Sequence, residues 1–488
     1  MRVTLQDYVT DPSLFQKDGV NLAHENISAL MARGGFSGLS VEFHEINRLL
    51  SDESYARRTL SGVDWVISNI GPHAHYYFHL REKLDLGFRI VRDVRTAIWS
   101  SYLLQEHLCE PHLREADVLL VASRYTRGIY ERIFPHLRKA RIIRCYPLTV
   151  GFPRRLPARS NGRAIFTLGY VGRLSVDKNF SDVVDLVLAL NRINERRFRL
   201  VACGDVHSPI CAPDRIRQQL HRKLGHADAF TYFPPRNNGQ VWELYRSFDA
   251  MAFPSTSNLE TLGRVLVEAS YADVPVVCGD HAAAPELVAP ESLCGVKYCA
   301  DKTYSTHFDH SLGTLDVSEL ARAVLDPELR ASQCHCNFES HGELLMHLLR
   351  EPDARDLEED GPVILSHSQR AFVDALDVTL PPAMDGTTAT EKVGDLIPWF
   401  LGLQRRHPVP REAWLESLRR LSHFPERTQG FIERSGGTRC DYTNVGGIDI
   451  EICHVADFFP TFRIRQFYVN DTLSGFDTSQ RNTQGDAN

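Results

Sequence analysis

Two cations near the start of a predicted helix form the first candidate binding site. In GYVGRLSVDKNF (169–180) an apolar strand ends at Gly172, and Arg173 and Lys178 follow before a helix predicted over 180–194. The exposed N–H groups and the positive dipole end at such a turn attract anions. Arginine can hold two phosphate oxygens at once and lysine adds a point charge, so the pattern suits a diphosphate. The alternative is a pair of solvated surface charges. The segment is not a P-loop, because G-x-x-x-x-G-K-[ST] is absent.

Two glutamates in ETLGRVLVE, Glu260 and Glu268, form a second candidate pair. Eight positions along a helix span about 12 Å. This distance exceeds the separation of ~5–9.5 Å between the paired carboxylates of glycosidases. It suits the two ends of an extended ligand such as a nucleotide sugar, whereas the alternative is an amphipathic helix with a capping glutamate. The helix that carries Glu268 is expected to begin with Thr261, Leu262 and Gly263.

Short apolar strands alternate with helical stretches up to about residue 350. Strands rich in Val, Ile and Leu between helices are typical of parallel sheets covered on both faces. A Pro-, Arg- and Gly-rich segment interrupts the pattern, which then restarts. The sequence therefore predicts an α/β fold with two Rossmann-like domains facing a cleft, ligands at the carboxyl ends of the strands, and a mainly helical C-terminal extension. The expected parts are an N-terminal, acceptor-side domain (1–150), a linker (151–163), a C-terminal nucleotide-sugar-binding domain (164–350), an acidic, Pro-rich linker (351–390), an extra module of unknown role (391–470) and a disordered tail (471–488).

The charge balance excludes a general nucleic-acid-binding surface. Of the 488 residues, 55 are Lys or Arg and 62 are Asp or Glu, and the net charge is -7. No apolar run approaches the ~18 residues of a membrane span. The eleven scattered Cys are typical of reduced thiols in a cytoplasmic protein. We expect no metal site, because Cys334 and Cys336 in QCHCNFESH (333–341) are too close for common structural zinc sites and lack a second Cys pair.

A basic segment covers the end of the first predicted domain and the linker. From Arg124 to Arg163 there are eleven Arg or Lys residues and one acidic residue, Glu131. We favour the interpretation that this belt is the solvated rim of a cleft that binds diphosphates. The alternative is peripheral contact with anionic lipid, or with a lipid-diphosphate acceptor, at the inner face of a membrane.

Taken together, in this order and spacing, the motifs resemble glycosyltransferase family 4, the retaining group with the GT-B fold among the glycosyl transferases group 1. The resemblance is dense over 165–350, only topological over 1–150, and stops beyond residue 350. The matching segments are YVGRL with Lys178 (170–178), RLVACGD (199–205), FTYFPPRNNGQVWELYRSFDAMAFPS (230–255), LETLGRVLVEA (259–269) and VPVVCGDHAAAPELV (274–288).

The resemblance implies roles for single residues on the donor side. Arg173 and Lys178 would bind the donor diphosphate beside Gly172. Glu260 would contact the hydroxyls of the transferred sugar, and Glu268 would hold the ribose hydroxyls. The other implied donor-binding positions are the backbone N–H groups of Thr261, Leu262 and Gly263, and Arg236 in the stretch where the family contacts the base.

The acceptor side departs from the family pattern. Asp18 and Gly19 stand where the family has a Gly-rich loop, but the usual Gly-Gly pair is missing. Many members carry a His after the strand matched by FRIVRDV, and this chain has Arg95 there. The histidines that follow the preceding strand are first interpreted as polar residues at a helix start. The functional alternative is that His75 or Arg95 faces the sugar.

The resemblance implies a retaining, hexosyltransferase-like enzyme that moves a sugar from a nucleotide-diphosphate sugar to a glycan, a lipid-linked molecule, a small molecule or a protein. Preorganised cations would stabilise the leaving diphosphate where negative charge develops. In the family the leaving phosphate is thought to take the acceptor's proton, so we expect no strong side-chain base, metal or cofactor. The alternatives are a non-catalytic GT-B-like scaffold or partner protein, and a related phosphate-binding enzyme such as a sugar epimerase or phosphorylase.

Overall fold

The computed structural model describes the central parts of the chain and several segments around them. The helices predicted over 20–33, over 97–108 and after residue 391 lie outside the described residues. The structure describes residues 1–6, 38–45, 48–49, 52–68, 74–94, 109, 112–133, 140–145, 164–257, 260–305, 309–331, 338–352, 365–370, 439–445, 448–454 and 462–469.

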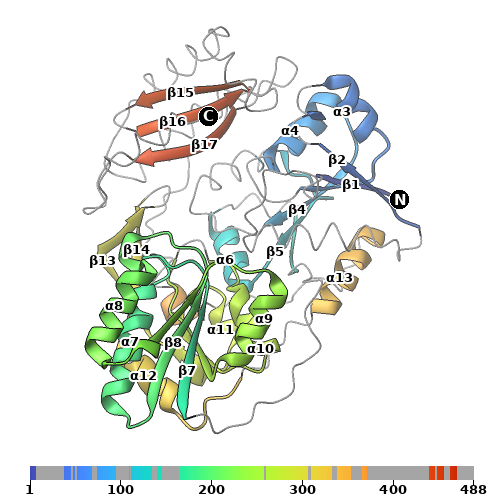
Figure 1. The fold of residues 1–488 in the computed structure, drawn as a ribbon. Helices are drawn as coiled ribbons and strands as arrows, with labels where there is room; N and C mark the ends of the chain where they lie inside the picture. Colours follow the sequence, from blue (N-terminus) through green and yellow to red (C-terminus); the bar gives the residue numbers. More distant parts are fainter. Residues whose placement is uncertain are drawn as a thin grey trace.

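The first domain is built on a six-stranded parallel sheet (Figure 1). Its order is β2 (Ser40–His44), β1 (Arg2–Gln6), β3 (Trp65–Ser68), β4 (Arg89–Val94), β5 (Val118–Val121) and β6 (Arg141–Arg144). All residues of β3 and β5 are buried, which fits apolar strands covered on both faces. The sequence pattern does not predict β1. This strand lies between β2 and β3, where Val3, Thr4 and Leu5 become fully buried.

Among the described residues, four helices accompany the first sheet. They are α3 (Glu53–Leu60), α4 (Ala74–Leu84), α6 (Arg124–Ile133) and α13 (Phe338–Arg350). The prediction of a helix over 74–84 is confirmed by α4. Helix α13 follows the second sheet in sequence but packs on the first: its Leu345 and Leu349 lie in one apolar cluster with Val3, and the Trp65 indole N–H donates to the Leu349 carbonyl at 3.1 Å. The predicted boundary at residue 350 assigns this helix to the second domain, but the helix packs against the sheet of the first domain.

The second sheet also has six parallel strands. Its order is β12 (Leu293–Cys294), β11 (Val276–Gly279), β10 (Ala250–Phe253), β7 (Ile165–Val171), β8 (Arg197–Cys203) and β9 (Phe230–Phe233). Counted from β9, the chain order is 3-2-1-4-5-6, which is the Rossmann arrangement. Ligands of such sheets bind outside the carboxyl ends of the strands at the switch point, here between β7 and β10.

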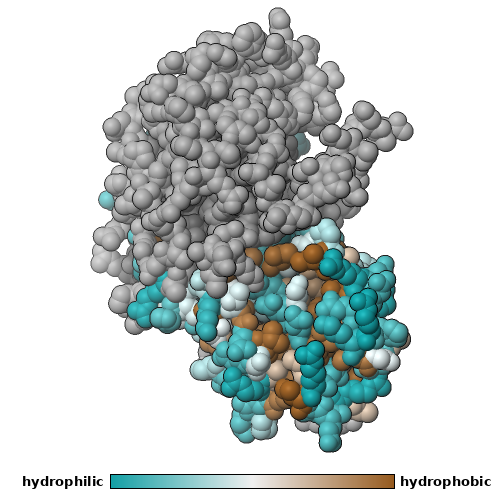
Figure 2. All heavy atoms as spheres, turned by 90° about the vertical axis from the view of Figure 1, so that its left-hand side faces the viewer, coloured by the Kyte–Doolittle hydropathy of each residue, from teal (hydrophilic) through white to brown (hydrophobic). Residues whose placement is uncertain are grey.

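Helices cover both faces of the second sheet, as its apolar strands require. One apolar cluster joins the sheet to α7 (Phe180–Ile193), α8 (Pro213–Leu224) and α12 (Val317–Leu325). The other joins it to α9 (Asn238–Ser247), α10 (Arg264–Tyr271) and α11 (Ala284–Leu287). Short 3-10 turns complete this domain at η4 (Pro209–Cys211), η5 (Ala227–Ala229) and η6 (Pro290–Ser292). On the face in Figure 2, hydrophilic side chains cover most of the described surface, so the apolar residues of the domain are mainly inside.

Antiparallel strands follow the two parallel sheets. Strands β13 (Val296–Ser305) and β14 (Asp309–Leu315) form a hairpin, and β15 (Arg439–Val445), β16 (Ile448–His454) and β17 (Phe462–Val469) form a three-stranded sheet (Figure 1). The strand predicted in GIDIEICHV is confirmed by β16. The fold class is confirmed as α/β with two Rossmann-like sheets, the GT-B arrangement. The expected mainly helical C-terminal extension is not confirmed, because the residues described beyond 390 all form strands. Among the described helices, none is both long and apolar enough to cross a membrane.

Candidate functional site

The segments that follow β7 and β10 meet at the switch point of the second sheet. Gly172 follows β7 with a φ of +148°, and Gly204 follows β8 with a φ of +152°. The Gly172 N–H donates to the Cys203 carbonyl at 2.9 Å. A Cβ atom on Gly204 would lie 1.8 Å from the Gly172 oxygen, so this close approach requires glycine. Neighbouring strand ends are thereby held together beneath the predicted anion site.

Arg173 and Asp177 form an ion pair in the turn after β7. A terminal guanidinium nitrogen of Arg173 lies 3.2 Å from an Asp177 carboxylate oxygen, and the Ser175 hydroxyl donates to the other oxygen at 2.5 Å. The Asp177 side chain is fully buried, while 34% of the Arg173 side chain is exposed. Burial opposes ionisation of Asp177, but Arg173, Lys178 and the hydroxyls of Ser175 and Ser257 outweigh it and lower the pKa of this carboxyl. Arg173 is therefore anchored on one side and open on the other.

Lys178 and Glu260 connect the two segments through an ion pair between the Lys178 ammonium and a Glu260 carboxylate oxygen. Only 14% of the Lys178 side chain and 11% of the Glu260 side chain are exposed. The Ser255 hydroxyl also donates to Glu260, at 3.0 Å. Burial, together with the nearby Arg173 charge, lowers the pKa of Lys178 to about 7, although Asp177 acts in the opposite direction.

Asn179 fixes the geometry of this junction. It stands before α7 in the left-handed conformation, with a φ of 49°. Its side-chain amide donates to the Pro254 carbonyl at 2.9 Å, the Thr256 hydroxyl at 2.9 Å and the Gly313 carbonyl at 3.2 Å. The start of α7 is thus tied to the segment after β10 and to the hairpin, which holds the cations in place relative to Glu260.

The backbone predicted to begin a helix at Thr261 is irregular instead. Helix α10 begins at Arg264, and Gly263 caps it with a φ of +77°. Thr261 and Leu262 are both mostly buried. Because Glu260 precedes the helix, helical spacing does not set its distance from Glu268, and the expected span of about 12 Å does not apply.

Glu268 lies within α10 and is held by two side chains. The Arg264 guanidinium lies 2.6 Å from one carboxylate oxygen, and the Tyr245 hydroxyl donates to the other at 2.8 Å. Burial and the Glu268 charge raise the pKa of Tyr245 well above its usual value, so it stays a hydrogen-bond donor. The orientation of the Glu268 carboxylate is therefore fixed without any ligand.

Arg236 marks the third segment at this edge, after β9. Its guanidinium lies 4.4 Å from the centre of the Phe233 ring, and the side chain is exposed. The Cys203 thiol donates to the Pro234 carbonyl at 3.5 Å. Burial raises the pKa of Cys203 although Arg236 opposes this, which favours the protonated thiol that donates to Pro234.

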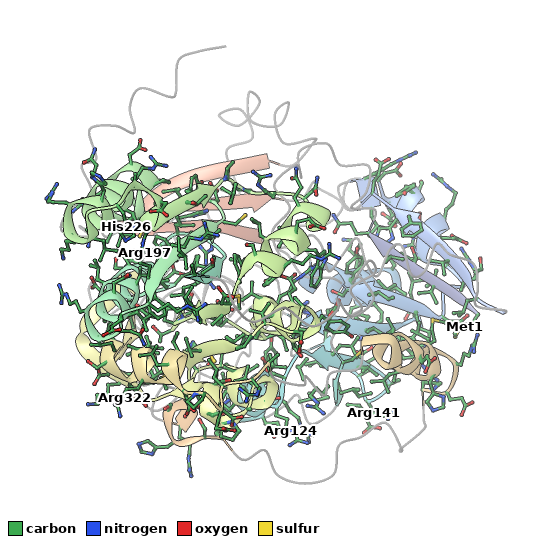
Figure 3. All side chains as sticks on the ribbon, turned by 60° about the horizontal axis from the view of Figure 1, so that its bottom comes forward. Met1, Arg124, Arg141, Arg197, His226 and Arg322 are labelled. Atoms are coloured by element: carbon green, nitrogen blue, oxygen red, sulfur yellow. The ribbon has the colours of Figure 1, made fainter. Side chains whose placement is uncertain are left out.

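The first domain contacts this site through the start of α6. The Ser123 hydroxyl donates to the Thr261 carbonyl at 2.9 Å. The backbone N–H groups of Arg124 and Tyr125 each donate to the Glu286 carboxylate at 2.8 Å. Burial raises the pKa of Glu286, and these two N–H groups oppose it. Figure 3 places Arg124 between the ribbons of the two domains. A carboxylate of the second domain thus caps a helix of the first.

The acceptor-side predictions receive less structural detail. His75 lies in the first turn of α4, after β3, and only its place in the helix is described. Gly19 and Arg95 lie outside the described residues, as do 332–337 of the Cys- and His-bearing segment and residues 134–139 and 146–163 of the basic belt. Within the part of the chain that is described, no group of three or more His, Cys, Asp or Glu is placed to hold a metal ion.

Several polar residues of the site were not singled out by the sequence pattern. Asp177 is adjacent to Lys178, and an acidic residue next to a cation in a turn is a weak local indication that the residue belongs to the site. Asn179, Ser257 and Glu286 give no such signal, because their partners lie far away in the sequence.

Comparisons with known proteins find a family match within the second domain. Residues 162–308 match the sequence model of the family described as Glycosyl transferases group 1. The chain is 33% identical over 125 residues to a D-inositol 3-phosphate glycosyltransferase of Actinosynnema mirum, a match that covers 25% of this chain and 29% of the relative. It is 37% identical over 90 residues to the enzyme of the same name from Mycolicibacterium smegmatis. This match covers 18% of this chain and 20% of the relative. The chain thus spans less than a third of the length of these curated relatives.

One structural likeness extends over both domains. The sucrose-phosphate synthase of Thermosynechococcus elongatus superposes with a TM-score of 0.53 at 15% identity, and the match covers 72% of this chain and 99% of that one. At this identity the likeness establishes the fold. The sequence match therefore concerns the second domain, and the shared architecture concerns both.

Proposed function

We propose that this protein is a retaining, family 4 glycosyltransferase that moves a sugar from a nucleotide-diphosphate sugar to an acceptor. The observation that supports it most directly is the contact of Lys178 with Glu260, since it joins a cation and a carboxylate at the switch point where such sheets bind ligands. The match of 162–308 to the group 1 family supports the same class.

The cations act on the leaving group in this proposal. As the sugar–phosphate bond breaks, negative charge grows on the diphosphate and positive charge on the anomeric carbon. Arg173, one-third exposed and anchored by Asp177, offers the remaining guanidinium N–H groups to phosphate oxygens. Lys178 has three N–H groups, so it can contact a phosphate while it keeps Glu260. These donors are placed before the reaction, which favours the transition state over the ground state.

The two glutamates orient the donor in the same scheme. Glu260 accepts hydrogen bonds from hydroxyls of the transferred sugar, and Glu268 accepts those of the ribose. The proton of the acceptor passes to the leaving phosphate. Two cations at the diphosphate do the work of a metal ion, so the proposed reaction needs no metal. The acceptor approaches from the first domain, on the side where Ser123 contacts Thr261 in the donor loop, by which we mean residues 254–257 and 260–263 between β10 and α10.

Transfer or hydrolysis assayed with UDP-, GDP-, ADP- and dTDP-sugars tests the proposal. We expect turnover of at least one donor, and we expect Arg173→Ala or Lys178→Ala to lower kcat by about 10²- to 10³-fold. Arg197→Ala is the matched control, because Arg197 is half-exposed, pairs with Asp228 and begins β8 at the opposite end of the strand. If no nucleotide or nucleotide sugar binds and Glu260→Ala changes nothing, the proposal fails and a non-catalytic scaffold becomes the better description.

A further inference from the structure

His281 is a buried histidine beside the donor loop. It lies within the motif VPVVCGDHAAAPELV (274–288), but neither the sequence analysis nor the proposed chemistry gives it a role. It follows β11, in the turn before α11, and is 3% exposed. One ring nitrogen, Nε2, lies 2.8 Å from the Ser257 carbonyl oxygen, and Nδ1 lies 2.8 Å from the Tyr298 hydroxyl. A carbonyl can only accept, so Nε2 carries a proton, and in the neutral ring Nδ1 accepts from Tyr298. Both nitrogens are engaged by protein groups, so His281 does not reach a substrate.

Ser257 transmits the position of His281 to the donor site. Its carbonyl also accepts the backbone N–H of Glu260 at 3.1 Å, so one oxygen is shared by the histidine and by the residue that faces the sugar. Its hydroxyl donates to Asp177, the carboxylate that anchors Arg173. A continuous series of hydrogen bonds therefore runs from Tyr298 through His281 and Ser257 to both sides of the site.

A segment from beyond the second sheet braces the turn that carries His281. The Ser366 hydroxyl donates to an Asp280 carboxylate oxygen at 2.9 Å, and the Gln369 amide donates to the Ala282 carbonyl. Gln369 is 4% exposed, which shows that the segment is seated and not resting on the surface. Ala282 has a φ of +50°, a conformation that costs free energy in a non-glycine residue and persists only when neighbouring groups hold it.

We propose that His281 is a positioning residue of the donor site, which fixes Ser257 and Glu260 against Arg173 and Lys178, and that residues 366–369 brace it from outside the two sheets. This inference rests on the proposed function. According to this proposal, residues 366–369, which lie beyond the two-domain fold, affect the rate of turnover.

His281→Ala and His281→Gln separate positioning from simple packing. The glutamine amide can replace Nε2–H as a donor to Ser257, whereas alanine cannot. We expect His281→Ala to lower kcat/KM by about 10- to 100-fold, mainly through kcat, and His281→Gln to restore most of it. Activity is measured per folded molecule, with thermal unfolding followed by circular dichroism. The donor is the one among UDP-, GDP-, ADP- and dTDP-glucose that the unmodified protein turns over.

Tyr298→Phe and Gln369→Ala keep the test decisive if His281→Ala fails to fold. Each removes one supporting hydrogen bond, and we expect a loss of several-fold to about tenfold in kcat/KM. Arg370→Ala is the matched control in the same segment, because Arg370 is exposed, and it should leave kcat/KM unchanged. The proposal is overturned if the folded Tyr298 and Gln369 variants retain full kcat/KM, or if folded His281→Gln is as impaired as folded His281→Ala.

The two levels of inference fail in different ways. If the unmodified protein binds none of the four donors, the proposed function is lost. If it binds one, and Arg173→Ala abolishes that binding while the His281 and Gln369 variants behave as the unmodified protein does, only the positioning role is lost.

Discussion

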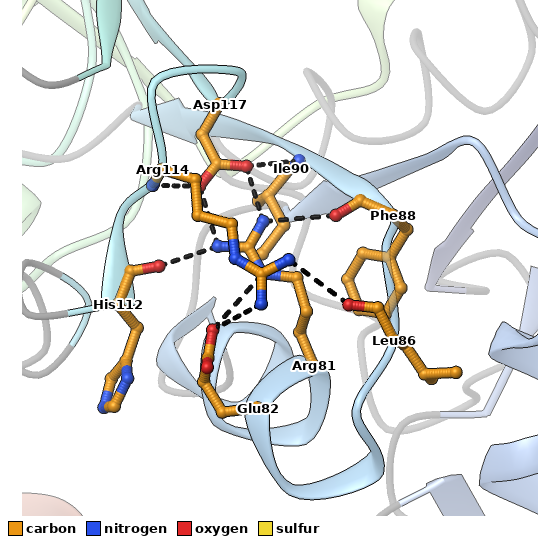
Figure 4. Close-up of polar contacts among 8 residues, drawn as sticks. All are labelled: Arg81, Glu82, Leu86, Phe88, Ile90, His112, Arg114 and Asp117. Atoms are coloured by element: carbon orange, nitrogen blue, oxygen red, sulfur yellow. Dashed lines mark hydrogen bonds and ion pairs between the residues drawn. The ribbon is translucent and has the colours of Figure 1, made fainter.

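Two buried arginine–aspartate pairs, one in each domain, serve different purposes. In the first domain Arg81 and Asp117 form a two-pronged ion pair at 2.6 and 2.8 Å (Figure 4). Asp117 also accepts the N–H groups of Ile90 and Arg114, each at 2.8 Å. Arg81 is fully buried and donates further to the carbonyls of Phe88 and His112. The hydrogen-bond partners of Arg81 and Asp117 named here all belong to the first domain.

The pair in the second domain is only half enclosed. Asp177 is as buried as Asp117, but Arg173 makes a single contact of 3.2 Å with it and keeps a third of its side chain exposed. Lys178 stands beside it with a lowered pKa. The comparison teaches that burial of a charge pair does not by itself indicate function. A cation that is anchored by a buried acid and still open to solvent can receive an anionic ligand, whereas a fully enclosed cation can only support the fold.

The largest expected effect is on stability, at Arg81. Arg81→Ala leaves the Asp117 charge buried without its partner and should lower the free energy of unfolding by about 3–5 kcal/mol. Arg173→Ala should cost less stability, because the Asp177 carboxylate keeps the nearby Lys178 charge and the hydroxyls of Ser175 and Ser257. Urea unfolding followed by circular dichroism measures both. Equal losses for the two variants would contradict the distinction between a fully enclosed and an open pair.

A double variant sharpens the same comparison. Arg81→Met combined with Asp117→Asn removes both charges together and keeps a side-chain oxygen that can accept from the backbone N–H groups of Ile90 and Arg114, so it should recover part of the stability lost in Arg81→Ala. Arg173→Met combined with Asp177→Leu should recover no activity, because an anion site needs the positive charge that the change removes.

The next effect is the pH dependence of nucleotide-sugar binding at Lys178. With a pKa of about 7, the unliganded lysine is protonated at pH 6 and mostly neutral at pH 8.5. A bound diphosphate favours the ammonium form, so binding above pH 7 takes up a proton, and affinity should fall towards about tenfold per pH unit. Below pH 7 it should level off. Titration calorimetry with a nucleotide sugar is suitable, because its diphosphate keeps its charge over this range.

Lys178→Arg is the control for that dependence, since arginine stays protonated throughout. We expect its affinity to vary little between pH 6 and 8.5. An unmodified protein whose affinity is equally flat would show that Lys178 is charged before the ligand arrives, and the second pair would then resemble the first more closely.

The smallest effect is expected at an exposed arginine of the first domain. Arg57 pairs with Glu53 at 2.8 Å along α3, and about half of each side chain is exposed. Arg57→Ala should change the free energy of unfolding by about 0.5 kcal/mol or less. The same urea experiment measures it. A loss comparable to that of Arg81→Ala would mean that burial is not what separates structural ion pairs from surface ones.

Much of the second domain is predictable from the sequence because its signals are local. The strand that ends before Gly172 and the helices over 180–193 and 317–325 follow from runs of apolar residues and their periodicity. The start of α10 is less predictable: Leu262 extends an apolar pattern, but the left-handed Gly263 delays the helix to Arg264. The separation of Glu260 from Glu268 therefore cannot be read from helical spacing.

By itself the sequence determined the alternating α/β order, the order of the glycosyltransferase-like motifs and the cations after β7. Each depends on neighbouring residues: apolar periodicity fixes an element, and a cation next to a helix start marks an anion site. Only the tertiary structure decided that Lys178 meets Glu260, that α13 packs on the first sheet and that His281 lies under the donor loop. Those contacts join residues that are far apart in the chain. A sequence pattern indicates that a polar or apolar side chain needs a partner, but it does not identify the distant residue that becomes this partner.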